Sequence, residues 1–184
     1  LECMEPLLDW AESIMENGKV TAKNVYGCNG WVAHTNTSPY GFTDPGVEIT
    51  WGLTPESSGW ICLNLYDMYD YSGSDEYLPR IYNVIQEAVR FYSEYLYYDS
   101  EKDEYIAGPA FSSEQTAVFS MGPKINQQII REIYTVYEKM SEKNIVADIK
   151  DAELIAKVKE QNPKLQSPVE IGDSGQIKEW VHEG

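Results

Sequence analysis

The chain has 184 residues, enough for one domain with a hydrophobic core, and its 30 acidic against 14 basic residues give a formal charge of −16. This charge excludes nucleic acid and anionic membrane surfaces as partners, because both would repel the chain, and it fits a soluble protein that handles neutral ligands. No apolar run approaches the roughly 18 residues of a membrane span.

Apolar residues at helical spacing predict an all-α fold, and no convincing ladder of strands is visible. The expected helices lie at 2–18, in a shorter stretch through Val25, at 56–71, from Ser74 to about residue 98, at 124–143, at 151–161 and from about Gln176. The first should end at Asn17-Gly18. Short links alternate with long ones at 27–55 and 99–123, and this alternation favours a stack or toroid of helical hairpins over a simple bundle. Long loops without secondary structure are usually functional.

Cys3, Cys28 and Cys62 are odd in number and show no metal-ligand spacing. We therefore expect buried thiols rather than a disulfide framework or a zinc site. Nothing in the sequence indicates a metal or another cofactor.

The loop 27–55 and the helix after it combine aromatic and polar side chains: Trp31, Tyr40, Trp51 and Trp60 alternate with His34, Asn36 and Glu48. Sugar rings present apolar C–H faces beside a girdle of hydroxyls, and aromatic platforms with amide, carboxylate and imidazole groups match both surfaces. The alternative is that the tryptophans belong to the core, that His34 is a hydrogen-bonded core histidine and that Glu48 is solvated.

The second long loop contains Gly108-Pro109-Ala110-Phe111-Ser112-Ser113-Glu114-Gln115. It places one carboxylate in a short segment of small residues between a tyrosine-rich helix and a well-patterned one. Partial desolvation of Glu114 would raise its pKa, as a general acid near neutral pH requires. Pattern alone also allows an ordinary solvated loop glutamate.

Five collinear motifs together resemble glycoside hydrolase family 95, whose members are mainly α-L-fucosidases acting on 1,2-linked fucose, with some α-L-galactosidases. They are the segment from Tyr26 to Thr37, Trp60-Ile-Cys-Leu-Asn-Leu-Tyr, Ser112-Ser-Glu114-Gln115, Gly122-Pro-Lys-Ile-Asn126-Gln-Gln-Ile-Ile-Arg131-Glu and Gly175-Gln-Ile-Lys-Glu179-Trp180. The resemblance implies that residues 1–184 form about half of a single (α/α)6 barrel catalytic domain, with long loops that carry the active-site residues.

The resemblance also implies an inverting hydrolysis in which Glu114 is the general acid. His34, Asn36, Glu48, Trp51 and Trp60 are the expected substrate-binding residues, although Trp60 either stacks on the sugar or packs the barrel. Gln115, Asn126, Glu179 and Trp180 are further candidates, with structural roles favoured.

The groups that position and activate the attacking water are expected outside these residues: an Asn-x-Asn pair before Leu1, and a His-Arg-His stretch and an Asp after Gly184. The chain, which starts without Met, should therefore be an inactive part of a longer protein whose expected partners are a fucosylated oligosaccharide and the remainder of its own catalytic domain. The resemblance suggests a bacterial glycan-degrading enzyme, whether secreted, at the cell surface or inside the cell.

Three departures from the family pattern bear on which sugar is preferred more than on the reaction class, and one of them is that the acidic residue usual after the Glu-Trp pair appears as Glu183. The chain has His34-Thr35-Asn36-Thr37-Ser38 where the family commonly has His-His-Asn-Thr-Asp, and Ser113 replaces the usual proline before the acid. An α-L-galactosidase and a non-catalytic carbohydrate-binding helical module thus stay open as alternatives.

Overall fold

The computed structural model describes residues 3–46, 49–112 and 119–180. Its helices and strands, with π-helical and 3-10 turns marked η, are α1 (Met4–Thr21), η1 (Ala22–Tyr26), α2 (Ile49–Gly52), α3 (Glu56–Ser72), α4 (Leu78–Tyr95), β1 (Tyr97–Asp99), β2 (Glu104–Ile106), α5 (Lys124–Ser141), η2 (Asn144–Val146), α6 (Ala152–Gln161) and η3 (Asn162–Lys164). The helices predicted over 56–71, 124–143 and 151–161 are confirmed as α3, α5 and α6.

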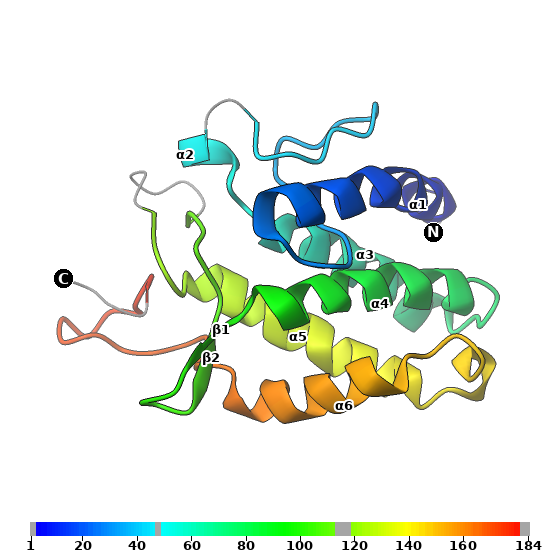
Figure 1. Ribbon diagram of the computed structural model, residues 1–184. Coiled ribbons are helices and arrows are strands. Elements are labelled where there is room, and N and C mark those ends of the chain that lie inside the picture. Colours follow the sequence, from blue (N-terminus) through cyan, green and yellow to red (C-terminus); the bar gives the residue numbers. More distant parts are fainter. Residues whose placement is uncertain (1–2, 47–48, 113–118, 181–184) are drawn as a thin grey trace.

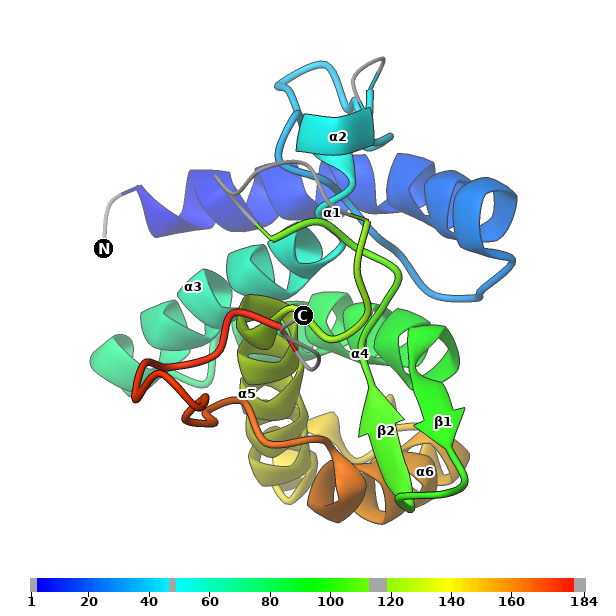
Figure 2. The same cartoon turned by 90° about the vertical axis from the view of Figure 1, so that its left-hand side faces the viewer.

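Helices α3 to α6 run across the view of Figure 1 in alternating directions, so that consecutive helices are antiparallel. α3 packs against both α4 and α5, α6 packs against α4 and α5, and α1 lies across α3 and α4 (Figure 2). Their apolar faces meet in one core that includes Leu65, Ile85 and Tyr134. This arrangement is the partial (α/α)6 barrel that the family resemblance implied.

The N-terminal ends of α3 and α5 lie at the same end of the molecule as α2, residues 107–112 and the C-terminal segment, on the left in Figure 1. Backbone hydrogen bonds join these parts: Phe111 N–H donates to the Leu53 carbonyl over 3.1 Å, and Lys124 N–H donates to the Glu179 carbonyl over 2.9 Å. Segments that are far apart in the sequence therefore meet beside the ends of two neighbouring helices.

The first helix does not end at Asn17-Gly18, as the sequence predicted, but continues to Thr21 and into η1. Gly18 lies inside the helix because Trp31 packs directly against it: a Cβ on residue 18 would lie 2.9 Å from Cε3 of the Trp31 indole and 2.9 Å from the Val32 carbonyl oxygen. The helical segment ends instead at Gly27, whose φ of 73° places it in the left-handed region.

Two sequence predictions outside the main helices were wrong. Strands β1 and β2 pair antiparallel, with Tyr98 opposite Tyr105, although strands of three residues are too short to show an alternating pattern. The helix expected from Gln176 is absent from the described residues up to 180, where Ile171 and Ile177 form an antiparallel bridge. Gly175, with a φ of 81°, makes the turn between these two residues, and the Gln176 carbonyl and the Lys178 N–H bond across it to Gly172 and Glu170 instead of forming a helix.

Cys28 and Cys62 are buried free thiols, as expected, but Cys3 is exposed because it precedes the first turn of α1. Across the described ranges, none of the helices has the length and apolar character needed to cross a membrane.

Candidate active site

A cleft of about 670 Å³ opens where the loop 27–55 meets three helices. Its volume falls within the range typical of small-molecule sites. Residues from α1, this loop, α3 and α5 line it: Trp10, His34, Thr35, Thr37, Trp51, Thr54, Ser57, Trp60, Ile61 and Ile125. We refer to it as the tryptophan cleft.

Indole side chains supply much of the apolar surface of the tryptophan cleft. Trp51 and Trp60 are 65% and 55% exposed, unusually high values for tryptophan, and Trp10 is half-buried. By contrast, Trp31 is fully buried in the core, where its indole N–H donates to the Val84 carbonyl over 2.9 Å. Only two of the four aromatic residues singled out in the sequence, Trp51 and Trp60, therefore line this cleft.

The hydroxyl groups of Thr35, Thr54 and Ser57, which line the same cleft, are hydrogen-bonded to one another. We call these three residues the hydroxyl cluster. Oγ1 of Thr35 lies 2.7 Å from Oγ1 of Thr54 and 3.4 Å from Oγ of Ser57, and the Ser57 hydroxyl donates to Oγ1 of Thr54 over 3.3 Å. The Thr35 backbone N–H also donates to Oγ1 of Thr54 over 2.8 Å, which fixes the cluster to the loop. Nearby, the Thr37 hydroxyl is buried without a hydrogen-bond partner among the described residues.

His34 is fully buried and both nitrogens of its ring are occupied. Nδ1 lies 2.7 Å from the Thr43 carbonyl oxygen, which can only accept, so Nδ1 carries the hydrogen. Nε2 therefore accepts the hydrogen bond of the Tyr26 hydroxyl, also over 2.7 Å. Burial lowers the pKa of His34 to about 4, so the ring is neutral at physiological pH and holds the loop in place.

The other polar residues that the sequence predicted for the site either do not line the cleft or lie outside the described residues. Asn36 is exposed and its side-chain amide donates to the Pro45 carbonyl over 3.3 Å; it is not among the residues that line the cleft. Glu48, Glu114 and Gln115 lie outside the described residues.

The chain on either side of Glu114 is anchored by the described residues. Ala110 and Ser120 exchange two backbone hydrogen bonds of 3.0 Å, and the rings of Phe111 and Phe119 meet edge to face. The Ser112 hydroxyl donates to a carboxylate oxygen of Glu179. Ser112 precedes Glu114 by two residues, so Glu179 holds the backbone close to the predicted acid.

One buried carboxyl group was missed by the sequence analysis. Glu56, at the start of α3, is only 2% exposed and accepts a 2.9 Å hydrogen bond from Nδ2 of Asn126, which is fully buried at the start of α5. In the sequence, Glu56 looks like an ordinary solvated acid in the first turn of a helix, where a negative charge interacts favourably with the helix dipole. No local signal connects it to a residue 70 positions away.

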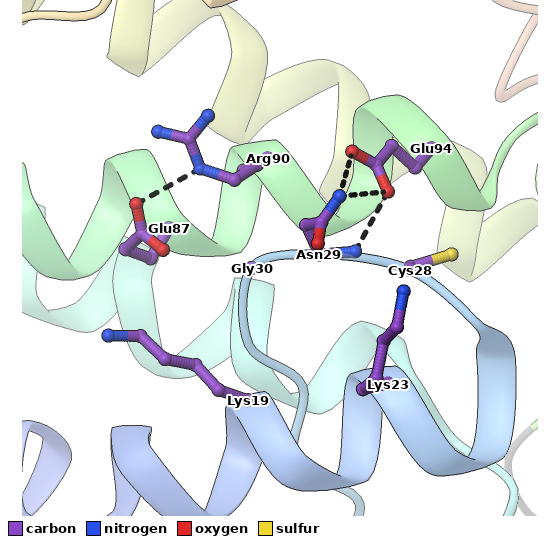
Figure 3. Close-up of a pocket in the computed structure, with 8 residues that line it drawn as sticks. All are labelled: Lys19, Lys23, Cys28, Asn29, Gly30, Glu87, Arg90 and Glu94. Carbon is purple, nitrogen blue, oxygen red and sulfur yellow. Dashed lines mark hydrogen bonds and ion pairs between the residues drawn. The ribbon is translucent and has the colours of Figure 1, made fainter.

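A second cleft, of about 460 Å³, lies between α1 and α4 and shares no residue with the tryptophan cleft (Figure 3). Its charges are compensated locally: Glu94 accepts from the Asn29 backbone and amide, Arg90 pairs with Glu87, and Lys19 pairs with Glu16. It contains no aromatic side chain, so it lacks the combination of surfaces that a sugar requires.

Within the described part of the chain, no group of three or more His, Cys, Asp or Glu side chains is placed to hold a metal ion.

Comparisons with known proteins agree with this geometry. Alpha-L-fucosidase 2 from Arabidopsis thaliana is 30% identical over 193 residues, an alignment that covers 99% of this chain and 22% of the plant protein. The chain superposes with a TM-score of 0.77 on a human-microbiome protein assigned as a kojibiose phosphorylase, at 10% identity, over 91% of this chain and 25% of that one. This second likeness shows the fold alone.

The chain thus spans about a quarter of the length of each of these two relatives. The model of the glycosyl hydrolase family 95 catalytic domain matches residues 1–184. With the whole chain matched, this protein belongs to glycosyl hydrolase family 95, within its catalytic domain.

Proposed function

We propose that the chain is part of an inverting glycosidase that removes terminal α-L-fucose, in 1,2 linkage, from oligosaccharides or glycans. The observation that carries this proposal is the tryptophan cleft, in which exposed indoles and the hydroxyl cluster line the same space. Family membership and the 30% identity to a protein named Alpha-L-fucosidase 2 support it.

The two surfaces of the cleft match the two surfaces of a deoxy sugar. The faces of Trp51 and Trp60 suit the C–H face and the methyl group of fucose, because aromatic rings pack well against apolar C–H groups. Thr35 and Ser57 can donate to or accept from sugar hydroxyls, since a hydroxyl side chain does both. Neither feature requires a charged substrate, in agreement with the net charge of −16.

In the proposed reaction Glu114 acts as the general acid. Its proton passes to the glycosidic oxygen while the bond from that oxygen to the anomeric carbon breaks, and a water oxygen attacks the anomeric carbon from the opposite face. The water loses its proton to a base, and β-L-fucose is the first product. Inverting enzymes hold their two carboxyl groups roughly 6.5–9.5 Å apart to admit this water.

The base and the residues that orient the water would come from the remainder of the catalytic domain. We therefore expect residues 1–184 alone to be inactive, and every kinetic test below uses the full-length protein. Support for Glu114 comes from its flanks: the Ser112–Glu179 hydrogen bond and the Ala110–Ser120 bridge anchor the neighbouring backbone, and Phe111 N–H donates to the carbonyl of Leu53, which lies between Trp51 and Thr54 of the cleft wall.

The test is hydrolysis of 2′-fucosyllactose by the full-length protein, followed by proton NMR to identify the anomer that appears first. We expect β-L-fucose, and we expect Glu114→Gln to reduce kcat by at least about 100-fold while the sugar still binds. Glu142→Gln, an exposed carboxyl directly after α5 and far along the chain from the cleft residues, is the matched control and should keep full activity.

Initial release of α-L-fucose would contradict the inverting mechanism. Turnover of an α-L-galactoside without turnover of the fucoside would reassign the sugar within the same family. Binding of fucose without turnover of either substrate would show that the protein is a carbohydrate-binding module and not an enzyme.

A further inference from the structure

Glu56 and Asn126 form a buried pair that joins the first turns of α3 and α5. The carboxylate oxygen Oε2 of Glu56 accepts from Nδ2 of Asn126 over 2.9 Å, and the two side chains are 2% and 0% exposed. The other polar atom of the Asn126 amide, Oδ1, is buried and has no hydrogen-bond partner among the described residues. A buried acceptor without a donor is costly, so this atom requires an explanation.

No cation compensates the Glu56 carboxyl group, since none of the ion pairs found among the described residues includes it. The titratable groups that act on it electrostatically are Tyr26 of η1 and Tyr92 and Tyr95 of α4. Burial raises the pKa of each of these tyrosines well above its usual range, so all three are neutral. An ionised Glu56 would therefore be a buried charge without a counter-charge, which protein interiors disfavour strongly.

A proton on Glu56 would resolve both problems. A protonated carboxyl group has an O–H to donate, and Oδ1 of Asn126 is a buried acceptor that lacks a donor. Burial independently raises the pKa of Glu56 to about 7, against the smaller opposing effects of its own backbone N–H and of Asn126.

We propose that Glu56 is held as a neutral carboxylic acid paired with Asn126, and that this pair is a positioning element that fixes the starts of α3 and α5 behind the tryptophan cleft. Neither Glu56 nor Asn126 is among the residues that line the cleft. The pair acts through its neighbours, because Ser57 follows Glu56 and Ile125 precedes Asn126, and both of these residues line the cleft. Trp60 lies one helical turn after Glu56.

The proposal predicts that the contact between the starts of α3 and α5 loosens when the pH rises and Glu56 ionises. When Glu56 loses its proton, its carboxylate and Oδ1 of Asn126 become two acceptors without a proton to share, and their repulsion is strong at low dielectric. Ser57, Trp60 and Ile125 would then lose their fixed spacing, so sugar affinity should fall before the chemical step is affected.

The first measurement is independent of the proposed function. In infrared difference spectra of the full-length protein, the carbonyl band of a protonated carboxylic acid should be present at pH 5.5 and should disappear as the pH rises through about 7. Glu56→Gln should remove this band, whereas Glu142→Gln, at an exposed carboxyl, and Glu114→Gln, which removes the proposed general acid, should both retain it. A wild-type spectrum without such a band at pH 5.5 overturns the proposal.

The second measurement compares unfolding. The melting temperature of wild type should fall relative to that of Glu56→Gln as the pH is raised from 5 to 8, because only wild type ionises at this position. Gln keeps the hydrogen bond to Asn126 and should fold normally. Parallel melting curves for the two proteins over this range would contradict a neutral acid at position 56.

The kinetic measurement rests on the proposed function. On a fucoside substrate, KM of wild type should rise several-fold between pH 6 and 8 with little change in kcat, and Glu56→Gln should show a flat KM profile. Parallel KM profiles of the two proteins, despite a titrating infrared band, would reject the positioning role and leave a structural one. If the protein turns over no substrate, the proposed function fails while the infrared and unfolding results still decide the state of Glu56.

Discussion

The Tyr26 hydroxyl donates a 2.7 Å hydrogen bond to Nε2 of His34, and the opposite nitrogen of the same ring is held by the Thr43 carbonyl. The imidazole thus joins the end of η1 to the loop 27–55 and cannot rotate without losing a partner. Since Thr35 and Thr37 follow directly in the cleft wall, the position of His34 sets the position of their hydroxyls.

Tyr26→Phe should destabilise the full-length protein by about 1–3 kcal/mol, because it leaves the buried Nε2 of His34 without a donor. Urea unfolding monitored by tryptophan fluorescence measures this change. Tyr40→Phe, which removes the hydroxyl of a 96% exposed side chain, is the control and should leave the unfolding midpoint unchanged. An equal midpoint for Tyr26→Phe and wild type would show that water replaces the lost donor.

Acid should lower the stability of the fold by protonating His34. Its pKa is lowered from 6.5 to about 4 in the fold, so the unfolded chain binds a proton more readily than the native one. The stability that the neutral ring contributes is complete above pH 6.5 and is lost as the pH falls to about 4, by about 3 kcal/mol in all. Unfolding free energies of wild type and His34→Gln between pH 7 and 4 test this, since the variant should lose less stability over that range; equal losses would exclude His34 as the titrating group.

The exposed indoles should contribute mainly to substrate binding. Trp51→Ala and Trp60→Ala should each raise KM for a fucoside by about tenfold, equivalent to about 1.4 kcal/mol, with a smaller effect on kcat. Tyr40→Ala serves as the control, because this exposed aromatic side chain lies outside the cleft. An unchanged KM in Trp60→Ala would favour a packing role for this residue within the complete barrel.

The hydrogen bond between Ser112 and Glu179 should matter for the chemical step. Ser112→Ala and Glu179→Ala should each lower kcat, and their effects should be strongly non-additive in the double variant, because either change removes the same contact. The measurement is a double-mutant cycle on kcat. Additive effects would mean that the two side chains support the loop independently.

Glycines with positive φ differ in what surrounds them. At Gly30 a Cβ would lie 2.2 Å from the Glu87 carbonyl oxygen, whereas at Gly27 no heavy atom lies within 4 Å. Gly27→Ala should cost only the left-handed strain of about 1–2 kcal/mol. Gly30→Ala should cost about 1–3 kcal/mol more, since the loop must move away from α4. Equal melting temperatures of the two variants would contradict this close approach.

The sequence predicted the helices well because their apolar faces repeat at a local period, as in α4 and α5. The β1–β2 hairpin was missed since it is too short to show a pattern, and the expected helix after Gln176 was wrong because Gly175 makes a turn there.

For the site, the sequence could single out Trp51 and Trp60 but not distinguish them from Trp31, whose burial depends on contacts with α4. The Glu56–Asn126 pair could not be predicted, because each residue has an ordinary local context and only the packing of α3 on α5 brings them together.

The hydroxyl cluster has a consequence for selectivity. Thr54 is held by main-chain groups, since its Oγ1 accepts from the Thr35 N–H and its hydroxyl donates to the Gly52 carbonyl over 3.3 Å, whereas the Thr35 hydroxyl can be donor or acceptor toward Thr54 and Ser57. An incoming sugar hydroxyl therefore meets one hydroxyl, that of Thr35, that can either donate or accept, beside one whose hydrogen bonds are already fixed. We therefore expect the hydroxyl cluster to tolerate sugars that differ in the orientation of one hydroxyl, and discrimination between such sugars to depend on the indoles of Trp51 and Trp60 beside it.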